Sequence, residues 1–283
     1  MMGDGASIPI HYWDIHPNFG DLLAPWLVEK MTGRPVHLVK EAEAPKKPHY
    51  VLIGSILSHV RSGSIVWGTG SFGTETDAQV SLAAQYTAVR GPLTRNRIRI
   101  LKAECPAIYG DPALLTPYFY RPKITPRHEV GVVIRHSEGD WRNALAQSGI
   151  KTIDLKTDRI EETLDAMLSC KRIVTSSLHG LILADAYGIP NAWLDSRSPW
   201  GLNFKYWDYL ISVDKVRHPT AFDFRRKDLT LDEVLAAFPF DDRPIRIDLE
   251  ALIAVNPFGW APSERADDII PMRPMPGRGR MPG

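Results

Sequence analysis

The sequence predicts an α/β protein with two doubly wound, Rossmann-like domains that face each other across a cleft. Short, mainly apolar runs such as residues 50–54 and 130–135 alternate with segments of helical apolar spacing, which is typical of parallel sheets covered on both faces. The alternation stops at residues 116–129, where three prolines interrupt it, and then begins again. A chain of 283 residues is long enough for two domains of modest size.

The first half begins with an apolar strand at residues 8–13. A turn at residues 16–20 leads to a helix, because apolar residues recur at helical spacing after Asp21 and Gly33 suits its C-terminal end. Three further buried strands are predicted at residues 50–54, 65–68 and 86–90, the last followed by a helix at about 93–102.

After the linker, strands and helices alternate in the same way. Strands are predicted at residues 130–135, 151–155, 172–175 and 191–194, with helices at 141–147, 160–170 and up to 187. We therefore expect an N-terminal α/β domain at residues 1–120 and a C-terminal α/β domain at 121–262. Residues 263–283 contain few large apolar side chains and are predicted to be a flexible basic tail.

The composition excludes several classes of protein. With 44% hydrophobic and 24% charged residues, the chain is neither disordered throughout nor a coiled-coil rod. A net charge of +1 gives no electrostatic footprint for nucleic acid. Its last 13 residues hold Arg273, Arg278 and Arg280 and no acid, so the rest is slightly acidic.

The location of the protein can also be predicted. Two cysteines, Cys105 and Cys170, are too few for a disulfide framework. We find neither a secretory signal nor an apolar stretch long enough to cross a membrane, so we expect a soluble cytoplasmic protein.

Two candidate ligand loops lie at strand-to-helix junctions of the first half. Asn18, Gly20 and Asp21 form a tight turn before a helix whose first amides can hold an anion. An ordinary glycine turn with an aspartate cap explains the same residues. Gly70 and Ser71 belong to a loop of small residues after a buried strand, which permits close approach of a ligand or equally of another backbone segment.

Two charged residues follow in similar positions. Arg90 ends a strand, where a guanidinium can bind carboxylate or phosphate in a planar fork, or can pair with a nearby acid instead. Asp111 precedes Pro112, which indicates a helix cap, although this position also borders the expected cleft.

The most informative motif lies at residues 176–180, between a strand and an apolar helix. His179 is expected in the first turn of that helix, where the positive end of the helix dipole lowers the pKa of the imidazole and favours the neutral ring. A neutral ring suits proton transfer near neutral pH, whereas a lone histidine at this position is also compatible with packing against the sheet. Ser177 lacks the G-x-S-x-G context of a nucleophile, and no motif indicates a metal site.

Taken together and in order, these motifs resemble the polysaccharide pyruvyl transferase family, in its bacterial exopolysaccharide branch. The resemblance covers residues 18–208 and includes Gly188-Ile189-Pro190 and the segment from Phe204 to Asp208. It implies two Rossmann-like domains of the glycosyltransferase-B type. It also implies transfer of the enolpyruvyl group of phosphoenolpyruvate to two hydroxyls of a sugar in an exopolysaccharide repeat unit, with release of phosphate.

The resemblance also implies roles for individual residues. His179 would be the general acid and base, and Asp111 or Asp21 would orient the acceptor. Phosphoenolpyruvate is a highly charged anion, for which Arg90, Arg135, Lys205 and the helix start at His179 offer positive groups. The expected substrate-binding set is Asn18, Gly20, Asp21, Gly70, Ser71, Arg90, Arg135, Ser177 and Lys205. Phosphoenolpyruvate is a substrate here, and no cofactor is required.

The sequence departs from the family's motif at one position, and two alternative functions remain open. Many members of the family carry arginine two positions before the motif histidine, where this chain has Ser177, so the donor would depend on Arg135 or Lys205. Because family members act on lipid-carried repeat units, the protein is expected to contact the inner face of the plasma membrane, through the basic tail if at all. The alternatives are a nucleotide-sugar glycosyltransferase of the same fold and a non-catalytic glycan-binding relative.

Overall fold

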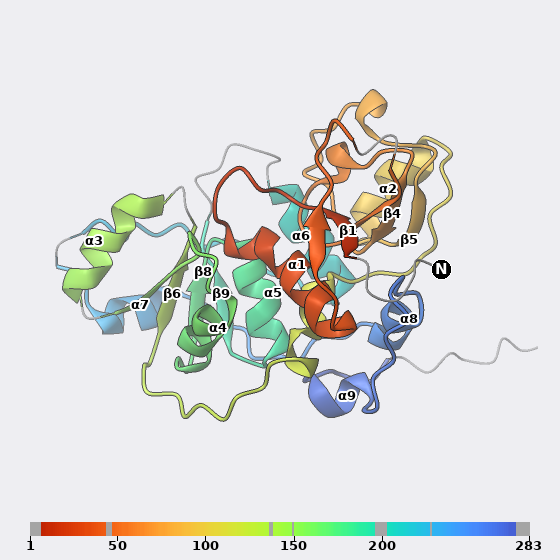
Figure 1. Cartoon of the computed structure of the whole chain (residues 1–283). Helices are drawn as coiled ribbons and strands as arrows, with labels where there is room; N and C mark the ends of the chain where they lie inside the picture. Colours follow the sequence, from red (N-terminus) through yellow and green to blue (C-terminus); the bar gives the residue numbers. More distant parts are fainter. Residues whose placement is uncertain are drawn as a thin grey trace, which may run out of the picture.

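The computed structural model describes residues 7–43, 47–135, 138–148, 150–195, 203–226 and 228–275, and in them it shows two parallel β-sheets packed with helices (Figure 1). The first sheet contains β1 (Ile8–His11), β2 (Val36–Leu38), β3 (His49–Val51), β4 (Ser64–Trp67) and β5 (Gln85–Ala88). The second contains β6 (Gly131–Ile134), β7 (Lys151–Asp154), β8 (Ile173–Thr175) and β9 (Asn191–Trp193). The predicted α/β class with parallel sheets is confirmed.

The two sheets share one strand order. The first runs β2-β1-β3-β4-β5 and the second β7-β6-β8-β9, so in each the second strand in sequence lies outside the first. The order reverses between β1 and β3 in one sheet and between β6 and β8 in the other. Ligands of open parallel sheets bind beyond the carboxyl ends of the strands at such reversals. The topology therefore marks the segments after β1, β3, β6 and β8 as the place to look for a site.

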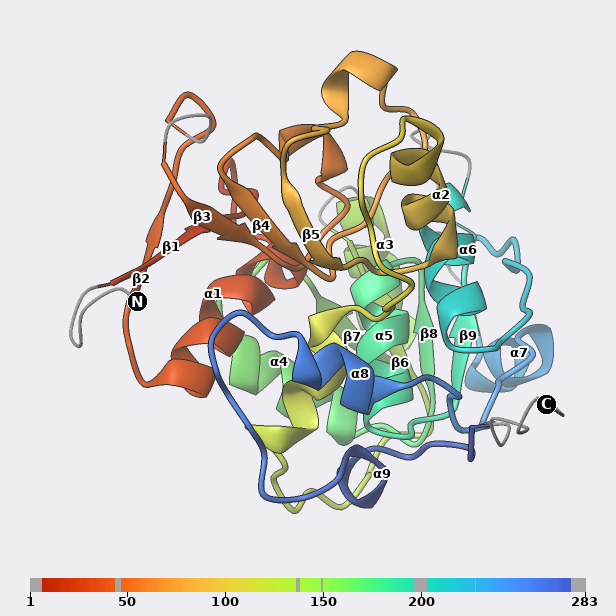
Figure 2. The ribbon, with the colours of Figure 1, turned by 90° about the vertical axis from the view of Figure 1, so that its right-hand side faces the viewer.

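The helices fill the space between and around the sheets. They are α1 (Phe19–Thr32), α2 (Pro92–Ile100), α3 (Gly139–Ser148), α4 (Ile160–Leu168), α5 (Leu178–Ala186), α6 (Phe204–Ser212), α7 (Leu231–Ala237), α8 (Leu249–Ala254) and α9 (Ala266–Ile269), with the 3-10 helix η3 at Pro112–Tyr118. The first helix ends as predicted, because Gly33 adopts a left-handed conformation (φ 65°) and its N–H bonds to the carbonyl of Glu29. In both views α1 and α5 lie between the two sheets (Figures 1 and 2).

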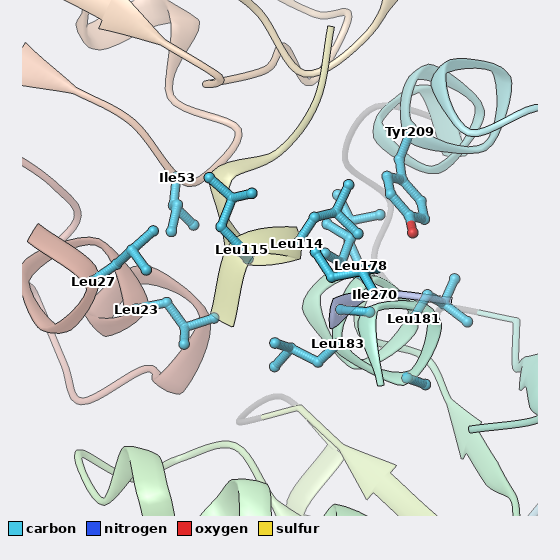
Figure 3. Close-up of a cluster of buried hydrophobic side chains, with 14 of the residues drawn as sticks. Leu23, Leu27, Ile53, Leu114, Leu115, Leu178, Leu181, Leu183, Tyr209 and Ile270 are labelled. Atoms are coloured by element: carbon cyan, nitrogen blue, oxygen red, sulfur yellow. The ribbon is translucent and has the colours of Figure 1, made fainter. Parts of the chain in front are cut away.

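One hydrophobic core joins the two halves of the chain. Figure 3 shows Leu23 and Leu27 of α1 and Ile53 of the first half grouped with Leu114 and Leu115 of η3, Leu178, Leu181 and Leu183 of α5, Tyr209 of α6 and Ile270. The residues of this cluster are almost completely buried, so separating the two halves would expose a large apolar area to water.

The linker prediction is wrong at its beginning. Thr116 and Pro117 were assigned to the segment 116–129 between the domains, but both are buried within η3, which packs on α5. Asp111 caps η3 and Pro112 occupies its first position, so the helical turn continues through the prolines at 112 and 117. The irregular connection begins only after this turn.

The predicted flexible tail is folded over its first part. Within residues 263–275, α9 forms, Ala266, Ile269 and Ile270 are buried, and the guanidinium of Arg273 bonds to the carbonyls of Pro244 and Asp214. Two adjacent isoleucines suffice to anchor such a short segment on the core. Arg278 and Arg280 lie outside the described residues.

The last helices pack back on the first half. The indole N–H of Trp67 in β4 donates to the carbonyl of Leu252 in α8 at 2.9 Å, and the ring of Phe258 packs on Tyr50 at 4.8 Å between centroids. In Figure 2, α8 lies directly below the first sheet. Residues of the predicted C-terminal domain thus cover the N-terminal sheet. No helix among the described residues is long and apolar enough to cross a membrane.

Candidate active site

The beginnings of α1 and α5 meet at the reversal points of the two sheets. Gly20 is the second residue of α1 and His179 the second residue of α5. The backbone of Gly20 lies against the imidazole so closely that a Cβ atom at position 20 would overlap Nδ1 of His179. The sequence motifs around Gly20 and His179 therefore form one site, on which the starts of two helices converge. The Phe19 and Asp21 N–H groups already donate to the carbonyls of Leu155 and Asn18, so the Gly20 and His179 amides are among those left to bind a ligand.

His179 faces Asp111 across a short gap. Nε2 of His179 lies 3.8 Å from Oδ2 of Asp111, and both atoms are buried without a hydrogen-bond partner. The other oxygen of Asp111, Oδ1, accepts the backbone N–H of Ala113 at 3.0 Å, which fixes the carboxyl group. Buried polar atoms without partners are rare and call for an explanation such as a catalytic role.

The pKa values of His179 and Asp111 are in the reverse of their ordinary order. Burial, with the positive charges of Arg90 and Lys205, lowers the pKa of His179 to about 3. Burial raises the pKa of Asp111 to about 6, although Arg90 opposes the rise. A proton shared by the pair is therefore held by the carboxyl group, and the imidazole of the free protein is neutral at pH 7. The prediction of a neutral ring is consistent with this geometry.

A second carboxyl group lies on the α1 side of the site. The side-chain amide of Asn18 donates to Oδ2 of Asp21 at 2.5 Å. Burial raises the pKa of Asp21 to about 6, although the hydrogen bond from Asn18 and the charge of Lys205 oppose this rise. Asp21 also lies 3.3 Å from the position of a Cβ at Gly54, beyond the end of β3. Asn18 and Asp21 thus belong to the same site as His179.

Lys205, in the first turn of α6, carries an ammonium group whose pKa depends strongly on its surroundings. Burial and the neighbouring cations Arg135 and Arg90 lower its pKa to about 7, against the attraction of Asp21 and Glu138. Its ammonium group lies 5.2 Å from the ring centroids of both Phe72 and Tyr206. An anion bound beside it would restore its full charge.

Arg135 follows β6 and is held by a carboxylate. Its guanidinium donates to Oε1 of Glu138 at 3.0 and 3.2 Å, and the other oxygen of Glu138 accepts the Arg135 backbone N–H and the Ser176 hydroxyl. Glu138 is completely buried, whereas Arg135 keeps 13% of its side chain exposed. Arg135 therefore borders the site as a partly exposed cation.

Arg90 is placed differently from the expectation for a ligand-binding arginine. It is completely buried, and its guanidinium donates to Asp208 of α6 (3.2 Å), to the Ser55 hydroxyl (2.8 Å) and to the Ser71 carbonyl (3.0 Å). Asp208 also accepts the N–H and hydroxyl of Thr94 at the start of α2. Of the two readings left open for Arg90, the structure displays the ion pair.

Three other predicted site residues have structural contacts. Gly70 leaves room for Arg90, because a Cβ there would overlap the guanidinium. The Ser71 side chain is buried and bonds to Glu75 and to the Gly73 N–H. Ser177 caps α5 by accepting the Gly180 N–H at 3.5 Å, a long bond. Ser177 and Gly20 adjoin His179, whereas Gly70 and Ser71 contact the guanidinium of Arg90.

Two residues of the site were not predicted. Glu138 lies three residues after Arg135, and this charge spacing was the available signal. Asp208 lies in the segment that carried the family resemblance, but its ion pair with Arg90 joins residues far apart in the sequence. Among the residues that the structure describes, no group of three His, Cys, Asp or Glu side chains is placed to hold a metal ion.

Comparisons with known proteins indicate the family of the chain. The family model "Polysaccharide pyruvyl transferase" matches residues 44–198, more than half of the chain. An uncharacterized protein of Acanthamoeba polyphaga mimivirus, L143, is 28% identical over 88% of this chain and 88% of its own length. The succinoglycan biosynthesis protein ExoV of Rhizobium meliloti is 27% identical over 74% of this chain and 66% of its own length. No solved structure gives a significant match.

Proposed function

The chain belongs to the polysaccharide pyruvyl transferase family, and from this premise we propose that it forms a cyclic pyruvate ketal on a sugar of an exopolysaccharide repeat unit, using phosphoenolpyruvate as donor. The observation that carries the proposal is the meeting of two helix starts at Gly20 and His179, beside the buried ammonium of Lys205. Converging backbone amides and a buried cation suit a small, highly charged anion.

The donor binds where the positive groups converge. Its phosphate and carboxylate are held by the backbone amides of Gly20 and His179, by Lys205 and by the partly exposed Arg135. Arg90 does not bind the donor directly, because its N–H groups already bond to Asp208, Ser55 and Ser71. Through Asp208 it holds α6, and therefore Lys205, in position. The work of the family arginine that Ser177 replaces thus passes to Arg135 and Lys205.

The first chemical step is protonation of the methylene carbon of the donor. Binding of a trianion offsets the positive potential that lowers the pKa of His179, so the imidazole takes up a proton, and Asp111, largely ionised at pH 7, pairs with the imidazolium. His179 then delivers this proton to C3 of the donor, which makes C2 electrophilic and oxocarbenium-like. The pair is suited to this step because its two proton affinities are far apart in the free protein.

Two sugar hydroxyls complete the reaction. The first adds to C2 while its proton returns to the His179–Asp111 pair. The C2–O bond to phosphate then breaks, the second hydroxyl adds to C2, and its proton leaves with the phosphate group. Asp21, whose pKa of about 6 leaves it largely ionised at pH 7, accepts a hydrogen bond from an acceptor hydroxyl and orients it. The balance is one ketal and one inorganic phosphate per donor.

The wider setting of the reaction follows from the same proposal. The two parallel sheets with their common strand order support the expectation of a glycosyltransferase-B type of fold, which is part of this proposal. The repeat unit is carried by a lipid, so the protein works in the cytoplasm at the inner face of the plasma membrane.

Phosphate release tests the proposed function. Purified protein is incubated with phosphoenolpyruvate and chemically depyruvylated succinoglycan fragments, and inorganic phosphate and the ketal methyl signal are measured. We expect phosphate release that requires both substrates and that is lost in His179→Ala but kept in His37→Ala, an exposed histidine on the edge strand β2. Turnover of a sugar nucleotide with no phosphoenolpyruvate-dependent phosphate release would contradict the proposal, as would unchanged release in His179→Ala.

A further inference from the structure

A pocket lies along β9, the edge strand of the second sheet. It has a volume of about 500 Å³ and is formed by residues 216–220 and 239–243 on either side of Trp193. Backbone bonds hold both segments to β9, since the Thr220 N–H donates to Trp193 and the Asn191 N–H donates to Asp241. The segments that form the pocket are therefore fixed to the sheet by backbone hydrogen bonds.

The wall of the pocket contains a buried donor without a partner. Trp193 is 2% exposed, and its indole Nε1 has no hydrogen-bond partner. Leaving a buried N–H unpaired is unfavourable, so a ligand oxygen would stabilise it, but the nitrogen is itself inaccessible and can be reached only if the wall of the pocket shifts. Nothing in the reaction at His179 uses this group.

The floor of the pocket is rigid. Asp185 of α5 accepts bonds from Lys215 at 2.8 Å and from Arg217 at 2.9 Å, and both cations also approach Asp241. Arg243 binds Asp241 through two bonds of 2.9 Å. Since each charge in this network has an opposite partner, Arg217 and Asp241 are held in place before a ligand arrives.

The chemistry of the lining fits a neutral, polyhydroxylated ligand. Phe240 offers an aromatic ring, His218 a polar ring, and Asp242 and Arg243 offer charged groups in balance. A multiply charged anion would find no excess of positive charge here. Sugar rings present C–H faces that pack on aromatic rings and hydroxyl edges that bond to planar polar groups, so a saccharide matches both parts of the lining.

The pocket is connected to the active site by stacked rings. The ring of Trp193 stacks on Tyr206 with 4.6 Å between centroids and 22° between planes. The ammonium of Lys205 lies 5.2 Å from the centroid of the Tyr206 ring, and the Tyr206 hydroxyl donates to the carbonyl of Ser176. Only the side chains of Trp193 and Tyr206 therefore separate the pocket from Lys205, the cation proposed to bind the donor.

We propose that this pocket binds a saccharide unit of the acceptor glycan beyond the sugar that receives the ketal. This inference rests on the proposed function, because it takes the acceptor to be a chain of several sugars. The pocket would select glycans by the sugar that precedes or follows the modified one, and would hold the chain while the donor reacts.

The test measures glycan binding without donor. Depyruvylated succinoglycan fragments of graded length are titrated calorimetrically into the full chain and into Phe240→Ala and Asp242→Asn. The matched control is Asp158→Asn, an exposed aspartate that lines a different pocket beside β7. We expect affinity for the longer fragments to fall about tenfold in Phe240→Ala and severalfold in Asp242→Asn, with the control unchanged.

The outcomes separate this inference from the proposed function. Equal affinity in all variants, or no binding of any fragment to the unmodified protein, overturns the pocket assignment. Phosphate release that proceeds with the same acceptor KM in Phe240→Ala and Asp242→Asn overturns it too, while leaving the pyruvyl transfer intact. Glycan binding that these variants weaken, without any phosphate release, supports the pocket and contradicts the proposed reaction.

Discussion

Gly20 of α1 and the imidazole of His179 are in direct contact, although they belong to helices that follow strands of different sheets. No side chain larger than hydrogen fits between them. The position of the ring is therefore set by the backbone of the opposite half of the molecule, and the two halves must be correctly packed before His179 can meet Asp111.

Replacing Gly20 with alanine should displace this ring. The added methyl group overlaps Nδ1 of His179, and the ring can only move away from the start of α1. Because a misplacement of about 1 Å typically costs about 100-fold in rate, we expect kcat to fall by that order in Gly20→Ala with the fold retained. Gly139→Ala is the control, since a Cβ at Gly139 meets no atom within 4 Å. Steady-state phosphate release measures both, and wild-type kcat in Gly20→Ala would show that the ring position is unimportant.

The raised pKa of Asp111 predicts a variant that is more stable and inactive. The folded carboxyl holds its proton up to about pH 6, against 3.8 as the ordinary value, so ionising it destabilises the fold. This cost is absent below about pH 4 and complete above about pH 6. Asp111→Asn avoids it, and its free energy of unfolding at pH 8 should exceed that of the parent by up to about 3 kcal/mol. Urea unfolding at pH 4 and pH 8 tests this, and an equal difference at both pH values would contradict it.

Donor binding should take up protons. The pKa values of Lys205 and His179 are lowered to about 7 and about 3, so at pH 7.5 much of Lys205 and nearly all of His179 is neutral before the donor arrives. A bound trianion raises both pKa values and draws up to about two protons from the buffer, about one for each group. Calorimetry of phosphoenolpyruvate binding in two buffers of different ionisation enthalpy measures this number. Lys205→Met should reduce it and Lys156→Met, an exposed lysine, should not. A binding enthalpy independent of the buffer in the parent protein would refute the expectation.

The two candidate arginines should behave differently. Arg90→Met leaves the buried carboxylate of Asp208 without its cation, and we expect a loss of about 3–5 kcal/mol in the free energy of unfolding. The double variant Arg90→Met with Asp208→Asn should recover part of this loss. Arg135→Met should raise the donor KM more than the acceptor KM at a smaller cost in stability, because Arg135 is partly exposed. A stable Arg90→Met protein with a raised donor KM would instead make Arg90 a direct donor ligand.

Much of the fold was predictable because its signals are local. Of the nine strands formed by the described residues, eight were predicted from short apolar runs, and the end of α1 was predicted from Gly33. The strand β2 was missed, since its three residues lie at the sheet edge and are only partly buried. The extent of η3 and the docking of α9 were missed as well, because both depend on apolar contacts with residues distant in the sequence.

The site was predictable residue by residue but not as an arrangement. His179, Asp111, Asp21 and Asn18 were each recognised at a strand-to-helix junction, yet nothing local states that Gly20 touches His179 or that Asp111 faces it. For Arg90 the sequence left ligand binding and ion pairing open. Its partner, Asp208, comes from α6, so only the packing of α6 on α2 decides between them.

The return of α8 to the first sheet has a consequence for synthesis of the protein. The contacts of Trp67 with Leu252 and of Tyr50 with Phe258 form only after the chain has left the ribosome as far as residues 252 and 258. Until then, the first sheet exposes the apolar surface that α8 will cover, and a chaperone that binds such surface gains time to act. Nascent chains ending before residue 249 should therefore be the most prone to aggregate.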